Sequence, residues 1–175
     1  EQWRLLPSQP DWSAGFKRWK IGESHAQKKL KKFVNASLAT YKDDRDFPAL
    51  ASTSNISPFL ALGQISPRQI WHQVMQAQLE FPRLSKGADA YLRQLIWREF
   101  SYYLLYHFPK LTTTNFVSKF NAFKWKSNKR YLTAWQQGQT GYPIVDAGMR
   151  ELWHTGYMHN RVRMIVASFL TKDLL

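Results

Sequence analysis

The residues best suited to chemistry lie in one short stretch that combines flat rings, an amide and a guanidinium. Tyr91, Gln94 and Arg98 are three and four residues apart, so they share one face of a helix. Trp97 lies three residues after Gln94, beside that face. Such a surface can stack and hydrogen-bond a flat heterocycle or a nucleobase that has left its stack. The alternative is an ordinary buried tryptophan next to a surface ion pair between Arg98 and Glu99.

A second stretch is suited to binding an anion. It consists of Thr53, Ser54, Asn55, Ile56 and Ser57. Pro58 follows, as expected for a helix start, so hydroxyls, a side-chain amide and free backbone N–H groups come together there. This arrangement favours a phosphate, helped by the helix dipole. The alternative is that Ser57 only caps the helix and the rest is a loop.

A third stretch places cations at an expected helix start. Arg161 and Arg163 follow Asn160 in the sequence. The helix dipole disfavours positive charge at this end, and such a local conflict indicates an anionic partner. Asn160 could instead be a simple N-cap, and His159 a buried histidine with satisfied hydrogen bonds. The chain has no cysteine and no His-x-x-x-His pattern, so we predict no metal site.

Composition points to a globular protein with a polyanionic partner. The formal net charge is +13 and the pI is about 10.1, which favours nucleic acid. Aromatic residues make up 15% of the chain and include eight tryptophans; we expect most aromatics in the core, with some left to stack on a ligand. No apolar run reaches the roughly 20 residues of a membrane span, no signal peptide is recognisable, and the absence of cysteine fits a cytoplasmic protein.

Helical periodicity dominates the chain, and alternating strands are hard to find, so the predicted class is all-α. Ser24 with Gln27 and Ser66 with Gln69 have the spacing of capping boxes, and Gly148 permits close helix approach. The first expected helix carries Lys28, Lys29, Lys31 and Lys32 on one face, which we interpret as solvated. The expected helices cover about residues 24–41, 57–63, 66–81, 88–108, 128–137, 143–155 and 160–175.

The two ends of the chain differ from its middle. Residues 1–23 lack helical periodicity and are predicted to be a connector, whereas residues 24–175 are predicted to be part of one helical domain. The last expected helix runs to Leu174 and Leu175 without a cap, so we expect the sequence to be truncated.

Four motifs occur together in an order that resembles the DNA photolyase/cryptochrome family. They are Thr-Ser-Asn-Ile-Ser-Pro at 53–58, Leu-Ile-Trp-Arg-Glu-Phe at 95–100, Gly-x-x-Gly-Tyr-Pro-Ile-Val-Asp-Ala-Gly-Met-Arg at 138–150, and Met-His-Asn-Arg-Val-Arg-Met at 158–164. Matching positions run from Tyr41 to Leu175. The motifs look most similar to those of bacterial class I enzymes that repair cyclobutane pyrimidine dimers.

The resemblance implies a helical domain that binds U-shaped FAD and follows an N-terminal α/β antenna domain. It implies a deoxyribodipyrimidine photo-lyase: reduced flavin absorbs light and passes an electron to a flipped-out dimer, the ring splits, and the electron returns. The implied partner is DNA containing pyrimidine dimers, bound by a cytoplasmic monomer without a metal or a membrane. The identity of the antenna chromophore stays open.

Site residues follow from the same resemblance. Those implied at the flavin are Tyr41, Thr53, Ser54, Asn55, Ile56, Ser57, Tyr91, Gln94, Arg98, Tyr157, Asn160 and Arg163. Those implied at the lesion or the DNA backbone are Arg45, Gln94, Trp97, Arg98, Asn160, Arg161 and Met164. Trp97 matches the ring that packs against the dimer, and Trp125 matches the outermost tryptophan of an electron-transfer chain.

Some positions depart from the family pattern. Gln94 stands where many class I enzymes have a glutamate that hydrogen-bonds the dimer, so lesion class and efficiency are open. Tyr91 and Tyr157 stand where tryptophan is common. The downstream segment that completes the flavin site is absent, so we expect this chain alone to bind FAD weakly or not at all and to be inactive in repair. A cryptochrome-type photoreceptor and a basic helical DNA-binding fragment without chemistry are the alternatives.

Overall fold

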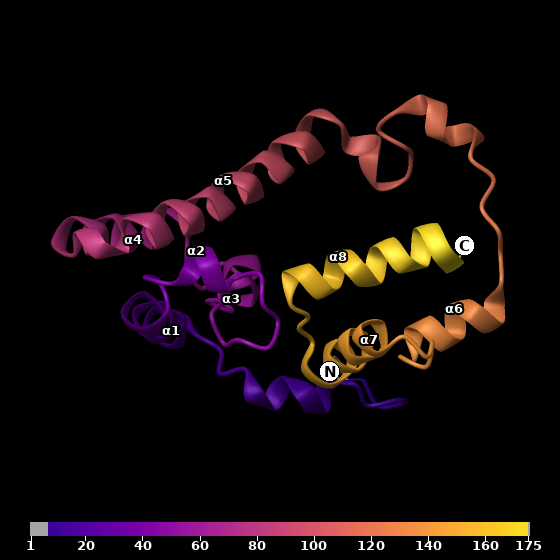
Figure 1. The fold of residues 1–175 in the computed structure, drawn as a ribbon, viewed down its shortest axis with the longest axis horizontal. Helices are drawn as coiled ribbons and strands as arrows, with labels where there is room; N and C mark the ends of the chain where they lie inside the picture. The colour runs from indigo at the N-terminus through magenta and orange to yellow at the C-terminus, as the bar shows by residue number, and fades with distance from the viewer. Residues whose placement is uncertain (1–6, 175) are drawn as a thin grey trace, which may run out of the picture. The chain divides into compact units, whose positions relative to one another are not determined.

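The computed structural model describes residues 7–174, so the first residues of the predicted connector lie outside the described range. Within that range every regular element is a helix, which confirms the predicted all-α class (Figure 1). The chain divides into two compact units, one formed by Glu1–Lys20 with Trp125–Leu175 and the other by Ile21–Lys124. The predicted division after residue 23 stays a prediction. No helix of the described residues is long and apolar enough to cross a membrane.

The unit Ile21–Lys124 is built around one long helix, α5 (Ser85–His107), which packs against α2 (Tyr41–Asp44) and α4 (Pro67–Glu80). Leu30 from the first helix, Leu38 from the turn after it, and Ile70 and Val74 from the fourth helix are fully buried. Removing such side chains from water is the main stabilising term of the unit. Its other elements are α1 (Glu23–Ala36), α2 (Tyr41–Asp44), α3 (Ser57–Ala61), α4 (Pro67–Glu80), η2 (Pro82–Leu84), η3 (Pro109–Thr112) and η4 (Ser118–Ala122).

The other unit centres on two packed helices, α7 (Pro143–Thr155) and α8 (Asn160–Phe169). Gly148 lies where they meet, because a Cβ added there would be 2.4 Å from a methyl carbon of Val162. The predicted close approach is therefore confirmed. Trp135 packs against the same core and donates its indole N–H to the Val166 carbonyl at 3.1 Å. The remaining elements are η1 (Ser13–Arg18), which packs on α7, then α6 (Lys129–Gln136) and a π-helical turn at Leu170–Leu174.

Helix starts were predicted with mixed success. The capping box of Ser66 and Gln69 is confirmed: the serine hydroxyl accepts from the Gln69 backbone N–H, and the Gln69 side-chain oxygen Oε1 accepts from the Ser66 backbone N–H. The box at Ser24 is wrong, because α1 begins at Glu23 and its N-cap is Gly22, whose φ is 109°. With a glycine that adopts this backbone geometry, the N-cap lies two residues earlier than predicted.

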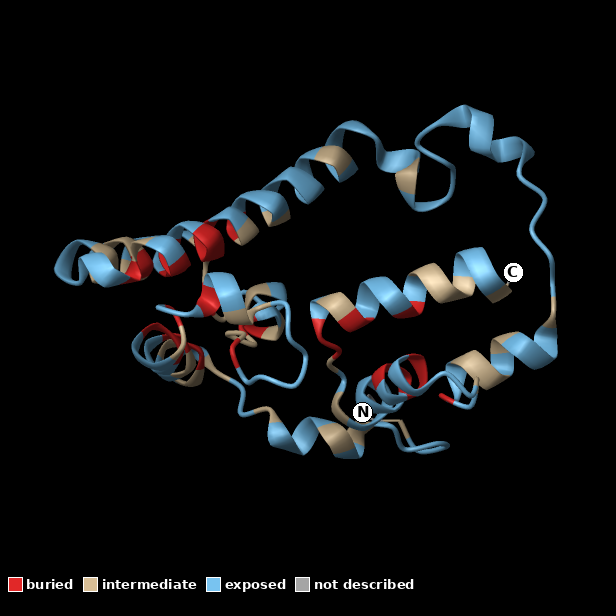
Figure 2. Cartoon of the chain, viewed as in Figure 1, coloured by how far each residue is buried: buried red, intermediate tan, exposed pale blue. Residues whose placement is uncertain are grey.

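The expected burial of most aromatic residues is wrong. Among the described residues, the buried aromatic side chains are Phe33, Tyr41, Phe59 and Tyr91. The first half of α5 is buried, whereas its second half and the segment after it are largely exposed (Figure 2). Trp97, Trp125 and Trp153 each expose more than half of their surface. Trp97 in one unit and Trp125 and Trp153 in the other therefore present large exposed rings.

One buried carboxylate shapes the turn that leads into α7. Asp146 accepts hydrogen bonds from the N–H and hydroxyl of Thr140, at 2.8 and 2.6 Å, and from the N–H of Gly141 at 2.9 Å. Burial alone would raise the pKa of Asp146, but these hydrogen bonds outweigh burial and hold the pKa below its ordinary value. The sequence indicated only packing here, so this turn-stabilising role was missed.

We expect Asp146→Asn to destabilise the protein near neutral pH by about 1–3 kcal/mol, because one amide nitrogen replaces an accepting oxygen. A carboxylate with a depressed folded-state pKa stabilises the fold above its unfolded pKa of about 3.9, and this contribution is lost as pH falls through the folded value. The stability gap between wild type and variant should therefore shrink below about pH 4. Denaturant unfolding of wild type and variant from pH 7 to pH 3 measures this difference in the free energy of unfolding, with Asp173→Asn, a substitution at an exposed aspartate, as control. A gap independent of pH would contradict the assignment.

Candidate functional site

The predicted site residues divide between the two units. The unit Ile21–Lys124 carries Tyr41, Arg45, Thr53, Ser54, Asn55, Ile56, Ser57, Tyr91, Gln94, Trp97 and Arg98. The other unit carries Trp125, Tyr157, Asn160, Arg161, Arg163 and Met164. Neither unit holds the whole predicted set.

The loop 53–57 is tied to α5 by a buried tyrosine. The Tyr91 hydroxyl donates a hydrogen bond to the Ser54 hydroxyl oxygen at 3.0 Å. Only 5% of Tyr91 is exposed, and its ring lies 4.6 Å from that of Phe33 and 5.2 Å from that of Tyr41, between centroids. Burial raises the pKa of Tyr91 to about 12, so its hydroxyl stays protonated as a donor. Tyr91 thus holds the loop from beneath and does not offer an exposed stacking face.

The loop's own backbone is bent at Asn55, and its polar residues are partly or fully exposed. Asn55 has a φ of 49°, in the left-handed region that asparagine tolerates better than most residues. Thr53 donates its hydroxyl proton to the Asn55 side-chain oxygen at 3.4 Å, while the side chain of Ile56 is buried in the core. Ile56 can therefore meet a ligand only through its backbone.

Ser57 is not the predicted N-cap. It is the first residue of α3, whose cap position is Ile56, and no side chain caps this helix. α3 is five residues long, so its dipole is small, and binding of an anion here depends on the loop's hydroxyl and N–H groups. Just before the loop, the buried Ser52 donates to the Asp44 carbonyl at 3.0 Å; nothing in the sequence singled it out.

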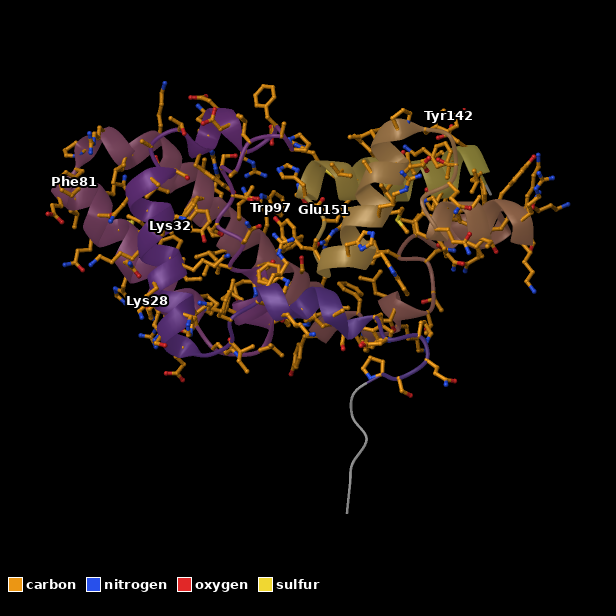
Figure 3. The ribbon with its side chains drawn as sticks, turned by 90° about the horizontal axis from the view of Figure 1, so that it is seen from below. Lys28, Lys32, Phe81, Trp97, Tyr142 and Glu151 are labelled. Carbon is orange, nitrogen blue, oxygen red and sulfur yellow. The ribbon has the colours of Figure 1, made fainter. Side chains whose placement is uncertain are left out.

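Trp97 is an exposed ring on α5, not a buried one. It exposes 62% of its surface and meets Phe100 edge to face at 5.9 Å between centroids. Figure 3 shows its side chain on the ribbon of α5. Gln94, one turn earlier, donates its amide to the Ala90 carbonyl at 3.1 Å and is half-buried. Trp97 is thus an exposed flat ring with an amide one turn away, whereas Tyr91, the second ring of the predicted platform, is buried. The role of this surface at a ligand stays a prediction.

The two predicted site arginines of this unit have partners close to them in the sequence. Arg98 is 2.6 Å from a Glu99 carboxylate oxygen and donates to the Tyr102 hydroxyl at 3.2 Å, so the surface ion pair considered from the sequence is present. Arg45 lies 3.3 Å from the Asp46 carboxylate and 5.4 Å from the centre of the Tyr41 ring. Exposed pairs of this kind are weak, so an anionic ligand could take over either guanidinium.

In the other unit, the start of α8 differs from the prediction. The N-cap is His159, whose Nδ1 accepts from the Arg161 N–H at 3.2 Å, and Asn160 is the first helical residue with an exposed side chain. His159 is buried, and its Nε2 has no hydrogen-bond partner among the described residues. Since Nδ1 is an acceptor, Nε2 carries the proton and is an unsatisfied donor. The expectation of a fully satisfied histidine is therefore wrong.

Polar and aromatic groups surround this helix start. Arg163 donates to the Met158 carbonyl at 3.3 Å, and Met164, with 56% of its surface exposed, has its sulfur 3.8 Å from the Arg161 guanidinium. Tyr157 is half-buried, with its ring 6.1 Å from that of Trp19. Asn160 and Met164, four residues apart, therefore expose their side chains on one side of α8. Among the described residues no cluster of His, Asp or Glu could hold a metal ion.

Comparison with known proteins gives the geometry its context. Residues 91–175 match the family described as the FAD binding domain of DNA photolyase. The chain is 48% identical over 174 residues to the deoxyribodipyrimidine photo-lyase of Agrobacterium fabrum, covering 99% of this chain and 36% of that protein. It is 40% identical over 162 residues to cryptochrome-2 of Arabidopsis thaliana, covering 90% of this chain and 26% of that protein. The chain thus spans about a third of the length of the curated relatives it matches.

A solved structure is similar as well. The crystal structure of a bacterial class III photolyase from Agrobacterium tumefaciens has a TM-score of 0.91 and 49% identity, and the match covers 99% of this chain and 36% of that one. The similarity to class I enzymes stays a prediction.

We expect Tyr91→Phe to destabilise the unit by about 1 kcal/mol, because the Ser54 hydroxyl loses its buried donor. Amide hydrogen exchange should quicken at residues 53–57, where the loop is no longer tied to α5. NMR measures the amide exchange rates, and denaturant unfolding measures the loss of stability. Tyr106→Phe is the matched control, since Tyr106 exposes 82% of its surface. Equal behaviour of the two variants would show that the loop does not depend on this hydrogen bond.

Proposed function

Because the chain belongs to the DNA photolyase/cryptochrome family, we propose that it is the flavin-binding and lesion-binding part of a light-driven enzyme that splits cyclobutane pyrimidine dimers in DNA. The observation that carries the proposal is the loop 53–57, which presents polar groups and is held in shape from the core by Tyr91. The proposal includes an N-terminal antenna domain joined through residues 1–23, with residues 24–175 as part of the helical domain. It also includes a cytoplasmic monomer.

The donors in this loop fit the phosphates of FAD. Thr53, Ser54 and Ser57 supply hydroxyls and Asn55 supplies an amide, which are the groups that bind phosphate without adding a counter-charge. Ile56 adds a backbone N–H, because its side chain is buried. We assign the phosphates to this loop.

The remaining flavin contacts are assigned by chemistry. Tyr41 and Tyr91 support the site from the core, and Gln94 and Arg98 offer an amide and a guanidinium to it. In the other unit, Tyr157, Asn160 and Arg163 offer a ring, an amide and a guanidinium. FAD, when bound and reduced, supplies an electron after it absorbs light. Trp125 exposes 58% of its surface, as suits an entry point for electrons from outside the protein.

The lesion is assigned to the exposed polar and aromatic side chains. Trp97 stacks on a base taken out of the duplex, and Gln94 hydrogen-bonds its edge but cannot transfer a proton as a carboxylic acid would. Asn160 and Met164 supply a polar and an apolar contact. Arg45, Arg98 and Arg161 bind backbone phosphates, for which the net charge of +13 provides a general attraction.

A cryptochrome-type photoreceptor is the second candidate. The cryptochrome of Synechocystis has a TM-score of 0.82 and 35% identity to this chain, over 89% of this chain and 33% of that one. Gln94 favours it, because the amide lacks the acidic proton of the common glutamate. Repair activity separates the two candidates.

Trp97→Ala should weaken binding of an oligonucleotide that contains one pyrimidine dimer by about 1–3 kcal/mol, or roughly 5- to 150-fold, because the stacking platform is lost. Binding to the undamaged oligonucleotide should hardly change, since phosphate contacts remain. Fluorescence anisotropy titrations of both oligonucleotides measure the two affinities. Trp153→Ala, which removes another exposed indole, is the matched control. If wild type binds both oligonucleotides equally, the proposed lesion site fails.

A further inference from the structure

The exposed face of α1 carries a concentration of positive charge to which the proposed function assigns no contact. Lys28, Lys31 and Lys32 are exposed, while Leu30 and Val34 on the opposite side are buried. Figure 3 shows Lys28 and Lys32 along this helix. Lys28 lies three and four residues before the other two, a spacing at which like charges oppose helix formation. No carboxylate lies within 4.0 Å of these three amines in the described part of the chain.

A groove beside this face brings in a further cation from another element. It has a volume of about 550 Å³ and is lined by Lys31 and Asn35 of α1, Gln73 and Gln76 of α4, and Arg83 of η2. Two cations therefore face one space from different sides, and three amides can donate hydrogen bonds into it. Glu80 also lines the groove and is the one carboxylate in its lining.

The arrangement suits a chain of phosphates better than a single anion. From Lys28 to Asn35 the helix rises about 10 Å at ~1.5 Å per residue, a length that spans several phosphates of a nucleic-acid strand. Lysines act as point charges that track such a backbone without reading bases. At the edge of the groove, Arg83 lies 5.8 Å from the centre of the Phe81 ring, which has 45% of its surface exposed.

We propose that the exposed face of α1 and the α1–α4–η2 groove form a second DNA contact that binds the phosphate backbone without regard to lesions. It rests on the proposed function only in taking DNA as the polyanion. Each phosphate that a lysine neutralises contributes about 0.9 to the slope of log affinity against log salt for B-DNA. This contact adds affinity for any duplex and leaves the choice of lesion to the Trp97 surface.

The test is binding of the chain to undamaged and dimer-containing duplexes over a range of salt concentrations. Lys28→Gln, Lys31→Gln and Lys32→Gln together should weaken binding to both duplexes by at least about tenfold in 0.1 M salt and make the salt slope shallower by about 2 to 3. The matched control replaces the exposed Lys110, Lys119 and Lys124 with glutamine, which removes the same charge from the same unit. Equal losses in the two triple variants, or no loss in the first, would overturn the proposal.

A single substitution checks the groove independently. Glu80→Gln removes a carboxylate that repels phosphate, so both duplexes should bind several-fold more tightly; unchanged or weaker binding would overturn the groove's part in the contact. The outcomes are separate from those of the proposed function. If wild type binds both duplexes equally but the triple lysine variant binds both more weakly, only the lesion site is contradicted. If wild type prefers the dimer-containing duplex but the triple lysine variant binds as wild type does, only the second contact is contradicted.

Discussion

The hydrogen bond from Tyr91 to Ser54 is the interaction on which the candidate cofactor loop depends. It joins the buried first half of α5 to a loop that has little other support: a buried Ile56 side chain, a left-handed Asn55 and a local bond from Thr53. The Tyr91 ring also contacts rings from α1 and α2. Three helices and the loop therefore share one buried point, and a pKa of about 12 keeps the donor protonated at any physiological pH.

The charged side chains contribute little to holding the elements of the fold together. Arg45 pairs with Asp46 and Arg98 with Glu99, which are sequence neighbours, so neither pair links two elements of the fold. Most positive charge lies on exposed faces such as that of α1. In a chain with 25 Lys and Arg against 12 Asp and Glu, the positive side chains repel one another and attract polyanions. The basic surface therefore costs stability in the free protein, and this cost is offset when phosphates are bound.

Periodicity and capping residues predicted the all-α class and most of the helices, because both are local properties, but the expected helix 24–41 is two helices, α1 (Glu23–Ala36) and α2 (Tyr41–Asp44). Which of two neighbouring residues caps a helix was harder to predict: His159 replaced Asn160, and Ile56 replaced Ser57, since backbone geometry from the surrounding fold decides the first helical residue. Periodicity indicated which residues share a face of α5, but not which face the rest of the fold would bury. Tyr91 was expected on a ligand-facing surface and is buried, whereas Trp97 is exposed as the ligand platform requires.

The hydrogen bonds of buried polar groups were not predictable either. Asp146 and His159 lie inside motifs that are recognisable in the sequence. The role of Asp146 depends on its hydrogen bond from Thr140 across a turn, and Nε2 of His159 has no hydrogen-bond partner among the described residues. Such contacts are set by tertiary packing and leave no periodic signal. The residue types at the site could therefore be predicted, but not their hydrogen-bond partners.

The most direct test of the flavin site is an NMR titration of the chain with FAD, followed at the backbone amides of residues 53–57. We expect shifts in these amides that depend on FAD concentration even if affinity is too weak to survive purification, and smaller shifts in Tyr91→Phe, whose loop is no longer tied to α5. Amides of 53–57 that do not move at millimolar FAD, while others do, would contradict the assignment of this loop as the phosphate-binding part of the flavin site.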